Sequence, residues 1–291
     1  MSVIRVGSRE SRLAVIQARQ VMEAIRAAQP GIELELVTMK TTGDRILDRT
    51  LDQVGGKGLF VKELDAALLE GRVDLTVHSL KDLPMETHPG LPVAAYSRRA
   101  DPRDALVLPE GTDTLDLSRP VGCASQRRKL QLERLFPGVR VEPVRGNVLT
   151  RLRKLDGGEY GALVLAAAGL ERLGLTGRVG RYFSTDEMIP AAGQGILAVQ
   201  VRAGSGWPWL SALNDPEAEA CAKSERAFVR ELDGGCSSPA AAYAAVAGGV
   251  ITLRGMTAGG RTGEGAAPLE EAEALGRTLA RKLREEERHG G

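Results

Sequence analysis

The chain has 291 residues and a formal net charge of +1, and this length suits two or three compact domains. The near-neutral charge and the low aromatic content of 3% argue against nucleic-acid binding. The chain has three cysteines without CxxC spacing and three histidines, which argues against a disulfide framework and against a metal centre. Because no apolar run approaches the roughly 18 residues of a membrane helix and the N-terminus lacks the apolar stretch of a signal peptide, we expect a cytoplasmic protein that binds no membrane.

The first part of the chain alternates between strand and helix patterns. Residues 3–6 predict a strand, and residues 11–28 carry apolar side chains at helical spacing. Apolar residues alternate with glutamates over residues 32–36, which is typical of a half-buried strand. A helix over about 59–69 and a strand over 73–77 follow. This βαβ pattern predicts a mainly parallel sheet covered by helices.

The same pattern begins again after the polar residues 97–103, which we expect to form a hinge. The expected elements are a strand at 121–123, a helix at 125–136, a strand at 139–144, a helix at 147–155 and a strand at 162–167. A strand at 196–201 then returns to the first sheet. The sequence therefore predicts two α/β lobes with crossing connections and a cleft between them.

A third unit begins near Asn214, where Asp215 and Pro216 favour the start of a helix that extends to about Leu232. Strands at 241–246 and 250–256, a glycine-rich surface loop at 259–265 and a charged helix at 269–286 complete a small α+β domain. The expected domains are a first lobe of residues 1–98 and 195–213, a second lobe of residues 99–194 and a C-terminal domain of residues 214–291.

Two junctions in the first lobe have the composition of anion sites. At residues 7–12 (GSRESR), backbone N–H groups, hydroxyls and the Arg9 guanidinium converge between a strand and a helix. A capped helix with an exposed arginine would have the same pattern. Residues 54–60 (VGGKGLF) resemble a phosphate-binding loop but lack the GxxxxGK[ST] pattern of an ATP site, and a mobile flap is an equal alternative.

Residues 78–84 (HSLKDLP) directly follow a predicted strand. Ligands of open α/β sheets bind at this end of the strands. Asp82, next to Lys81, is suited to stabilise a developing cation and to transfer protons. His78 is either a general base or, as for most histidines that end a strand, a structural residue.

Arginines accumulate at the corresponding edge of the second lobe. Of 39 basic residues, 31 are arginine, a bias that a GC-rich genome also produces, so their positions are more informative. Ser125 is expected to cap a helix whose first turn holds Arg127 and Arg128, where cations oppose the helix dipole. With Arg145 and Arg151, these guanidiniums suit a ligand with several carboxylates, and phosphate is an alternative.

Cys236 follows two glycines in a loop after a helix. Glycines allow the backbone to bring the thiol close to a cleft, where it can act as a nucleophile. A structural loop cysteine is the alternative, and no histidine or asparagine spacing indicates a cysteine hydrolase.

Taken together, these motifs resemble the hydroxymethylbilane synthase (porphobilinogen deaminase) family from Gly7 to about Tyr243. Each motif alone is weak, but their order and spacing are highly specific. The matching sequences are GSRES at 7–11, VGGKGLFVKEL at 54–64, HSLKDLP at 78–84, DPRDA at 101–105, RGN at 145–147, PAAGQG at 190–195 and LDGGC at 232–236.

The resemblance implies an α/β fold of two lobes arranged like periplasmic binding proteins, with the active site in their cleft, and a small α+β C-terminal domain. It implies an enzyme, a transferase that adds four porphobilinogen units to a covalent dipyrromethane cofactor and then releases the tetrapyrrole hydroxymethylbilane by hydrolysis. It also implies that no metal, nucleotide or redox cofactor is needed. We expect a monomer that binds porphobilinogen and neither nucleic acid nor a membrane.

The resemblance also implies the roles of particular residues. Cys236 would hold the cofactor through a thioether, and Asp82 matches the catalytic aspartate. Cofactor and substrate would contact Arg9, Ser11, Lys57, Phe60, Lys81, Ser125, Arg127, Arg128, Arg145, Gly146, Arg151, Arg172 and Gln194. Because each added unit needs space, we expect the lobes to shift about the hinge.

The chain departs from the family pattern at a few positions. Cys123 and Ala124 stand where the family has two hydroxyl residues, and Gln53 stands where several members have lysine. Two other classes of function remain open on the residues alone. One is a binding protein that closes on an anion without chemistry, and the other is a phosphate-handling transferase that uses residues 55–58.

Overall fold

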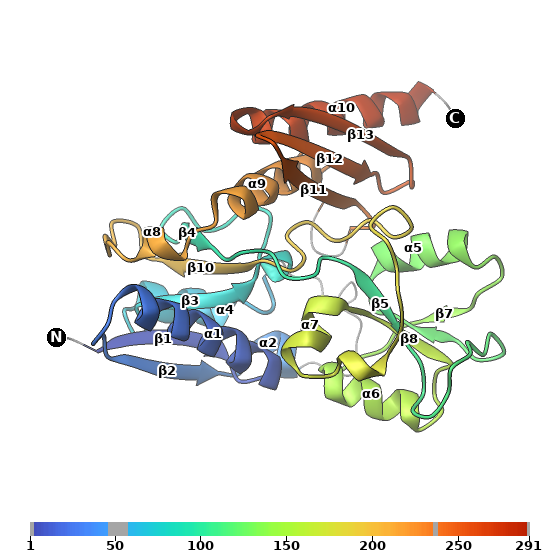
Figure 1. The fold of residues 1–291 in the computed structure, drawn as a ribbon, viewed down its shortest axis with the longest axis horizontal. Helices are drawn as coiled ribbons and strands as arrows, with labels where there is room; N and C mark the ends of the chain where they lie inside the picture. The colour runs from blue at the N-terminus through green and yellow to red at the C-terminus, as the bar shows by residue number, and fades with distance from the viewer. Residues whose placement is uncertain (1–2, 46–57, 235–237, 290–291) are drawn as a thin grey trace.

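The computed structural model describes residues 3–45, 58–234 and 238–289. Two five-stranded sheets lie beside each other, and a three-stranded sheet with two long helices covers them at one end (Figure 1). Among the described helices, none is long and apolar enough to cross a membrane.

The first sheet has the strand order β2-β1-β3-β10-β4. Its strands are β1 (Ile4–Arg9), β2 (Leu34–Met39), β3 (Leu75–Ser79), β4 (Val93–Tyr96) and β10 (Leu197–Val201). The accompanying helices are α1 (Arg12–Ala28), α2 (Thr42–Arg45), α4 (Lys62–Leu69), the 3-10 helix η1 (Leu80–Asp82) and α8 (Leu210–Leu213). Strands β1, β2 and β3 are parallel, and β10 is antiparallel to β3 and β4, so the predicted return of the chain to this sheet is confirmed.

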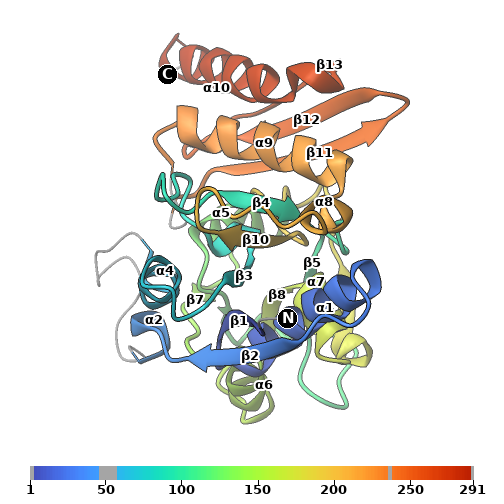
Figure 2. The same cartoon turned by 90° about the vertical axis from the view of Figure 1, so that its left-hand side faces the viewer.

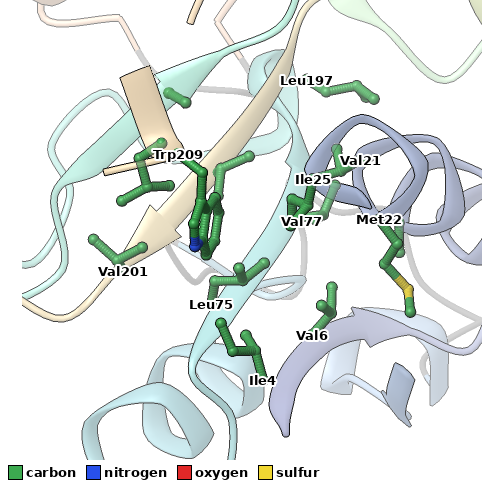
Figure 3. Close-up of a cluster of buried hydrophobic side chains, with 14 residues drawn as sticks. Ile4, Val6, Val21, Met22, Ile25, Leu75, Val77, Leu197, Val201 and Trp209 are labelled. Carbon is green, nitrogen blue, oxygen red and sulfur yellow. The ribbon is translucent and has the colours of Figure 1, made fainter. Parts of the chain in front are cut away.

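Helix α1 packs one apolar face against this sheet (Figure 3). Val21 and Ile25 from the helix meet Val6 on β1 and Val77 on β3 in the same buried cluster. Burial of each such side chain contributes about 1.5–3 kcal/mol. At the start of the helix, the Ser11 hydroxyl accepts a hydrogen bond from the Ala14 backbone N–H at 3.4 Å, which places the first turn of α1 at the end of β1.

The second sheet has the order β7-β6-β8-β5-β9. Its strands are β5 (Asp104–Val107), β6 (Val121–Gly122), β7 (Val141–Glu142), β8 (Ala162–Ala166) and β9 (Val179–Tyr182). Its helices are α5 (Gln126–Leu135), α6 (Val148–Asp156), α7 (Ala167–Arg172) and the 3-10 helix η2 (Thr176–Arg178). Strands β6, β7 and β8 are parallel, and β5 is antiparallel to β8. In the first sheet β10 is antiparallel to β3 in the same way, so both sheets share one topology. The predicted pair of α/β lobes is therefore confirmed.

Two chain segments cross between the lobes, one from β4 to β5 and one from β9 to β10. They are hydrogen-bonded to each other, since Ser97 N–H donates to Leu197 O at 2.9 Å and Ala100 N–H donates to Gly195 O at 3.2 Å. Gly195 has φ +91°, and a Cβ there would lie 2.5 Å from Ala100 O. Only glycine therefore allows the two crossings to lie this close together.

The C-terminal unit consists of α9 (Pro216–Glu231), β11 (Ala241–Ala247), β12 (Val250–Met256), β13 (Thr262–Pro268), the 3-10 helix η3 (Leu269–Glu271) and α10 (Ala272–His289). Its strands form an antiparallel sheet, and α9 and α10 pack against each other and against that sheet (Figure 2). As predicted, Asp215 caps α9 by accepting from Ala218 N–H at 2.8 Å.

The prediction of a surface loop at residues 259–265 is wrong from Thr262 onward, because Thr262–Pro268 is strand β13, whereas residues 259–261 lie outside any helix or strand. Its glycines lie against α10: a Cβ at Gly263 would come within 2.7 Å of Leu283 Cδ2, and one at Gly265 within 3.0 Å of Leu275 Cδ1. The glycines therefore permit close approach of a helix to a strand, a role that composition alone does not distinguish from a loop.

Candidate functional site

A cavity of about 600 Å³ lies between the two lobes, and we call it the interlobe cavity. Its walls include the carboxyl ends of β1, β3 and β8 and the amino ends of α1, α5 and α6. Ligands of open α/β sheets bind at this end of the strands, and helix N-termini favour anions. The cavity therefore lies where the sequence analysis expects a ligand.

The structure brings most of the predicted site residues together around this cavity. Those that line it are Arg9, Ser11, Phe60, Lys81, Asp82, Ser125, Arg128, Arg145, Gly146, Arg151, Arg172 and Gln194. Arg127 does not line it. Lys57 and Cys236 lie outside the described residues, as do residues 54–57 of the predicted flap at 54–60. The flap and the attachment of a cofactor at Cys236 therefore stay predictions.

Arg9 ends β1 and is held in place by two neighbours. Its guanidinium donates two hydrogen bonds to the carboxylate of Asp44 and lies 4.3 Å from the centroid of the Phe60 ring. Although burial raises it, hydrogen bonds from Arg9 and Thr41 keep the pKa of Asp44 below its usual range. Asp44 is not predictable as a site residue from the sequence, because no local pattern pairs positions 9 and 44.

Asp82 ends the 3-10 helix after β3, and its exposed side chain lines the interlobe cavity. The C-terminal unit holds the backbone of this segment. Arg226 on α9 donates to the carbonyl oxygens of Leu80 at 3.5 Å and of Pro84. The helix that precedes Cys236 in the chain therefore contacts the segment that carries Asp82.

Lys81 belongs to a partly buried chain of hydrogen bonds that joins both lobes. Its Nζ donates to Gln194 Oε1 at 3.2 Å, and Gln194 Nε2 donates to Asp104 Oδ1 at 3.0 Å and to Pro102 O at 2.7 Å. Burial, followed by the nearby Arg128 charge, lowers the pKa of Lys81 to about 8. Gln194 therefore connects the Asp82 segment to the start of the second lobe.

Asp104 pairs with two arginines inside the second lobe. Its carboxylate accepts from Arg127 Nη2 at 2.8 Å and from Arg128 Nη2 at 2.7 Å. Arg127 also donates to Ile189 O at 2.6 Å, and its side chain is only 4% exposed. The cations in the first turn of α5 are thus explained by Asp104, and Arg127 is turned away from the interlobe cavity.

Arg151 and Arg172 differ from this pair. Arg151 Nε donates to Gly146 O at 2.7 Å and Arg172 Nη2 donates to Gly195 O at 2.9 Å. Among the described residues, neither has a carboxylate partner within salt-bridge distance. Burial, and then repulsion from Arg128, lowers the pKa of Arg151 to about 10, and burial also lowers that of Arg172. These positive charges favour an anionic ligand.

His78 is a structural residue in this arrangement. It is buried, with Nε2 3.0 Å from Thr76 Oγ1. Burial, with a smaller contribution from Arg9, lowers its pKa to about 3, so the imidazole is neutral at physiological pH. It does not line the interlobe cavity, which disfavours the general-base alternative.

Cys123 stands where the family pattern has a hydroxyl residue, and its sulfur still accepts a hydrogen bond from the backbone of Ser125. The sulfur accepts a hydrogen bond from Ser125 N–H at 3.4 Å and is buried. Ser125 in turn caps α5 by accepting from Arg128 N–H at 3.5 Å. Within the described ranges, no group of three or more His, Cys, Asp or Glu residues is placed to hold a metal ion.

Two family models match most of the chain. Residues 4–206 match the model "Porphobilinogen deaminase, dipyromethane cofactor binding domain", and residues 219–285 match "Porphobilinogen deaminase, C-terminal domain". A porphobilinogen deaminase of Ruminiclostridium cellulolyticum is 58% identical over 264 residues, which cover 91% of this chain and 90% of that protein. The Chromobacterium violaceum protein of the same name is 46% identical, with 97% of this chain and 94% of that protein covered.

The comparison with solved structures gives distant matches. The aliphatic sulphonate binding protein SsuA of Escherichia coli is 12% identical with a TM-score of 0.42, over 80% of this chain and 71% of that chain. A substrate binding domain of a putative amino acid ABC transporter from Streptococcus pneumoniae is 14% identical with a TM-score of 0.44, over 79% of this chain and 98% of that one.

Proposed function

The chain belongs to the porphobilinogen deaminase family, and on that premise we propose that its interlobe cavity is the active site of a hydroxymethylbilane synthase. Such a transferase adds four porphobilinogen units, with loss of ammonia, to a dipyrromethane cofactor and releases the linear tetrapyrrole by hydrolysis. The observation that supports this site best is the pair of partly buried guanidiniums, Arg151 and Arg172, that have no salt bridge among the described residues.

The donor set of the cavity fits a pyrrole chain that carries acetate and propionate groups. Arg9, Arg128, Arg145, Arg151 and Arg172 line the cavity together, and guanidiniums bind carboxylates through paired, charge-assisted hydrogen bonds. Each added unit brings new carboxylates, so several arginines along one cavity suit a ligand that lengthens stepwise. We propose these five residues as the carboxylate-binding groups.

Asp82 is the proposed catalytic residue. Among the carboxylates that line the cavity, Glu10 pairs with Lys40 at 3.4 Å and Asp44 is bonded to Arg9 and Thr41. Asp82, at the end of the 3-10 helix after β3, is exposed to the cavity and forms no salt bridge among the described residues. A carboxylate in this position stabilises positive charge that develops on a pyrrole ring and accepts or donates protons. When bound, the dipyrromethane group supplies the pyrrole carbon that is extended, and Cys236 is the proposed point of attachment.

Lys81 and Arg127 have supporting roles in this proposal. Lys81 adds a cation beside Asp82, and Gln194 orients it from the second crossing. Arg127 acts through Asp104, which holds the neighbouring Arg128 at the cavity wall. Arg127 is therefore proposed as a positioning residue rather than a ligand-binding one.

The two-lobe topology alone would also suit a protein that binds an anion without chemistry. The matches to both family models and the 58% identity over 91% of the chain favour the enzyme instead. They also disfavour a phosphate-handling transferase, because the matched proteins are porphobilinogen deaminases along nearly their whole length. The domain boundaries given above, a monomeric state and a cytoplasmic location are part of the same proposal.

The proposal is tested with the arginines of α6. In Arg151→Gln the cavity loses a partly buried guanidinium, and we expect kcat/KM for porphobilinogen to fall by about tenfold or more, because a charge-assisted hydrogen bond contributes about 1.5–3 kcal/mol. Arg153→Gln is the matched control, since Arg153 is exposed on the same helix and donates to Thr150 Oγ1 at 3.2 Å. Equal activity of the two variants, or no consumption of porphobilinogen by the wild type, contradicts the proposal.

A further inference from the structure

A second cavity, of about 420 Å³, lies against the two crossings, and we call it the hinge cavity. Its walls are formed by α1 and β10 of the first lobe, by residues 97–100 of the first crossing, by the end of α7 and by Leu213 of α8. Of the residues that line it, only Arg172 also lines the interlobe cavity. The hinge cavity is therefore separate from the proposed active site but shares one charged side chain with it.

The walls of the hinge cavity combine apolar surface with positive charge. Val21, Ala24 and Leu197 supply apolar side chains. Arg98 and Arg172 line the cavity together with a single acidic residue, Glu171, and neither arginine forms an ion pair within the described ranges. This is the composition of a small-molecule site that takes an anionic group at one end and an apolar body at the other.

The remaining arginine of the lining is already neutralised. Arg99 Nη2 donates to the buried carboxylate of Glu225 at 2.6 Å, and Arg99 Nη1 donates to Gln194 O at 3.2 Å. Arg99 therefore fixes the wall of the hinge cavity to α9 and to the second crossing. The charge that is left for a ligand comes from Arg98 and Arg172.

The hinge cavity is bounded by both lobes and by the first crossing between them. Helices α1 and α7 belong to opposite lobes and lie beside each other (Figure 1), and the cavity is bounded by both. The crossings that meet there are joined by the Ser97–Leu197 and Ala100–Gly195 backbone hydrogen bonds, and Arg172 Nη2 donates to Gly195 O at 2.9 Å. A molecule in this cavity would contact both lobes and the connection between them.

We propose that the hinge cavity binds a small carboxylate with an apolar body about the size of one substituted aromatic ring. A bound carboxylate competes for Arg172, which the interlobe cavity also uses, and the apolar body lies against α1 and β10, so that one molecule contacts both lobes. Occupation therefore opposes substrate binding and lobe movement. The binding itself stands without the proposed function, whereas its effect on chain growth rests on it.

Binding is measured by titrating the holoenzyme with 3-phenylpropionate in a calorimeter. Arg98→Gln should weaken binding about tenfold, because it removes one charge-assisted contact, and Ala24→Trp should abolish it by filling the cavity. Arg19→Gln is the matched control, since this exposed arginine on α1 lines neither cavity. Unchanged affinity in Arg98→Gln, or equal loss in Arg19→Gln, overturns the proposal even if Ala24→Trp fails to fold.

The location is checked against the interlobe cavity. Arg151→Gln should leave the affinity for 3-phenylpropionate unchanged, and a large loss there would show that the probe occupies the interlobe cavity, which overturns the proposal. In native mass spectra of enzyme given limiting porphobilinogen, saturating probe should raise the fraction of chains with fewer added units in the wild type but not in Arg98→Gln. If the probe binds but no pyrrole unit is added, the result supports the hinge site and contradicts the proposed function.

Discussion

Charge compensation separates two kinds of arginine in the second lobe. The Arg127 guanidinium donates hydrogen bonds to the Asp104 carboxylate and to a backbone carbonyl. Among the described residues, the Arg151 guanidinium donates only to the carbonyl of Gly146. The sequence correctly predicted that arginines gather at the cleft edge. It could not show which of them are neutralised, because Asp104 lies 23 residues before Arg127 and pairs with it only in the folded lobe.

The role of Asp82 is tested by the isosteric change Asp82→Asn. We expect kcat to fall by about 100-fold or more, because a neutral amide neither stabilises a cation nor accepts a proton. The fold should be unchanged, since the side chain is exposed, and the urea midpoint provides the check. Asp113→Asn, an exposed aspartate outside both cavities, is the control. Near-normal turnover of Asp82→Asn would refute the assigned role.

The lowered pKa of Lys81 predicts that the activity depends on pH. Because burial lowers its pKa to about 8, Lys81 is cationic below this pH and becomes neutral as the pH rises through it. We expect kcat/KM for porphobilinogen to fall above about pH 8, since this quantity reports groups of the free enzyme. Lys81→Arg should keep its charge and shift the fall to higher pH. An identical pH profile for both proteins would show that another group is responsible.

At the scale of elements, local patterns predicted most of what the structure contains. Ser11, Asn147 and Asp215 each begin a predicted helix and cap it. The error at β13 has a tertiary cause, because Gly263 and Gly265 pair with β12 and lie directly under α10, where a Cβ would meet Leu283 or Leu275. The return of β10 to the first sheet was predicted, but the hydrogen bond between Leu197 of β10 and Ser97 of the first crossing joins residues that are distant in sequence.

Asp104 joins β5 to α5, and its removal should destabilise the second lobe. Asp104→Asn leaves two buried guanidiniums without a carboxylate, and loss of one partner of a buried ion pair costs about 3–5 kcal/mol. Asp156→Asn is the matched control, since Asp156 pairs with Arg178 near the surface and such pairs contribute about 1 kcal/mol or less. Urea unfolding measures both, and equal effects would contradict the central position of Asp104.

For the whole molecule, the C-terminal unit joins both crossings through one side chain. The fully buried carboxylate of Glu225 on α9 accepts hydrogen bonds from Arg99 Nη2 at 2.6 Å, from Gly193 N–H at 2.7 Å and from Ala244 N–H at 2.7 Å. Arg226, the next residue, holds the Asp82 segment. The unit that carries Cys236 is thus fixed to the hinge and to the proposed catalytic segment, an arrangement that three separately predicted units do not reveal.

The central claim is that one thiol anchors a pyrrole primer in the interlobe cavity, and intact-protein mass spectrometry tests it most directly. The denatured wild-type chain should exceed its sequence mass by one dipyrromethane, and Cys236→Ala should have its sequence mass. Cys221→Ala is the matched control and should keep the added mass, because burial raises the pKa of the Cys221 thiol to about 12 and leaves it unreactive. A wild-type chain at its bare sequence mass even after incubation with porphobilinogen, or an added mass that persists in Cys236→Ala, would contradict the claim.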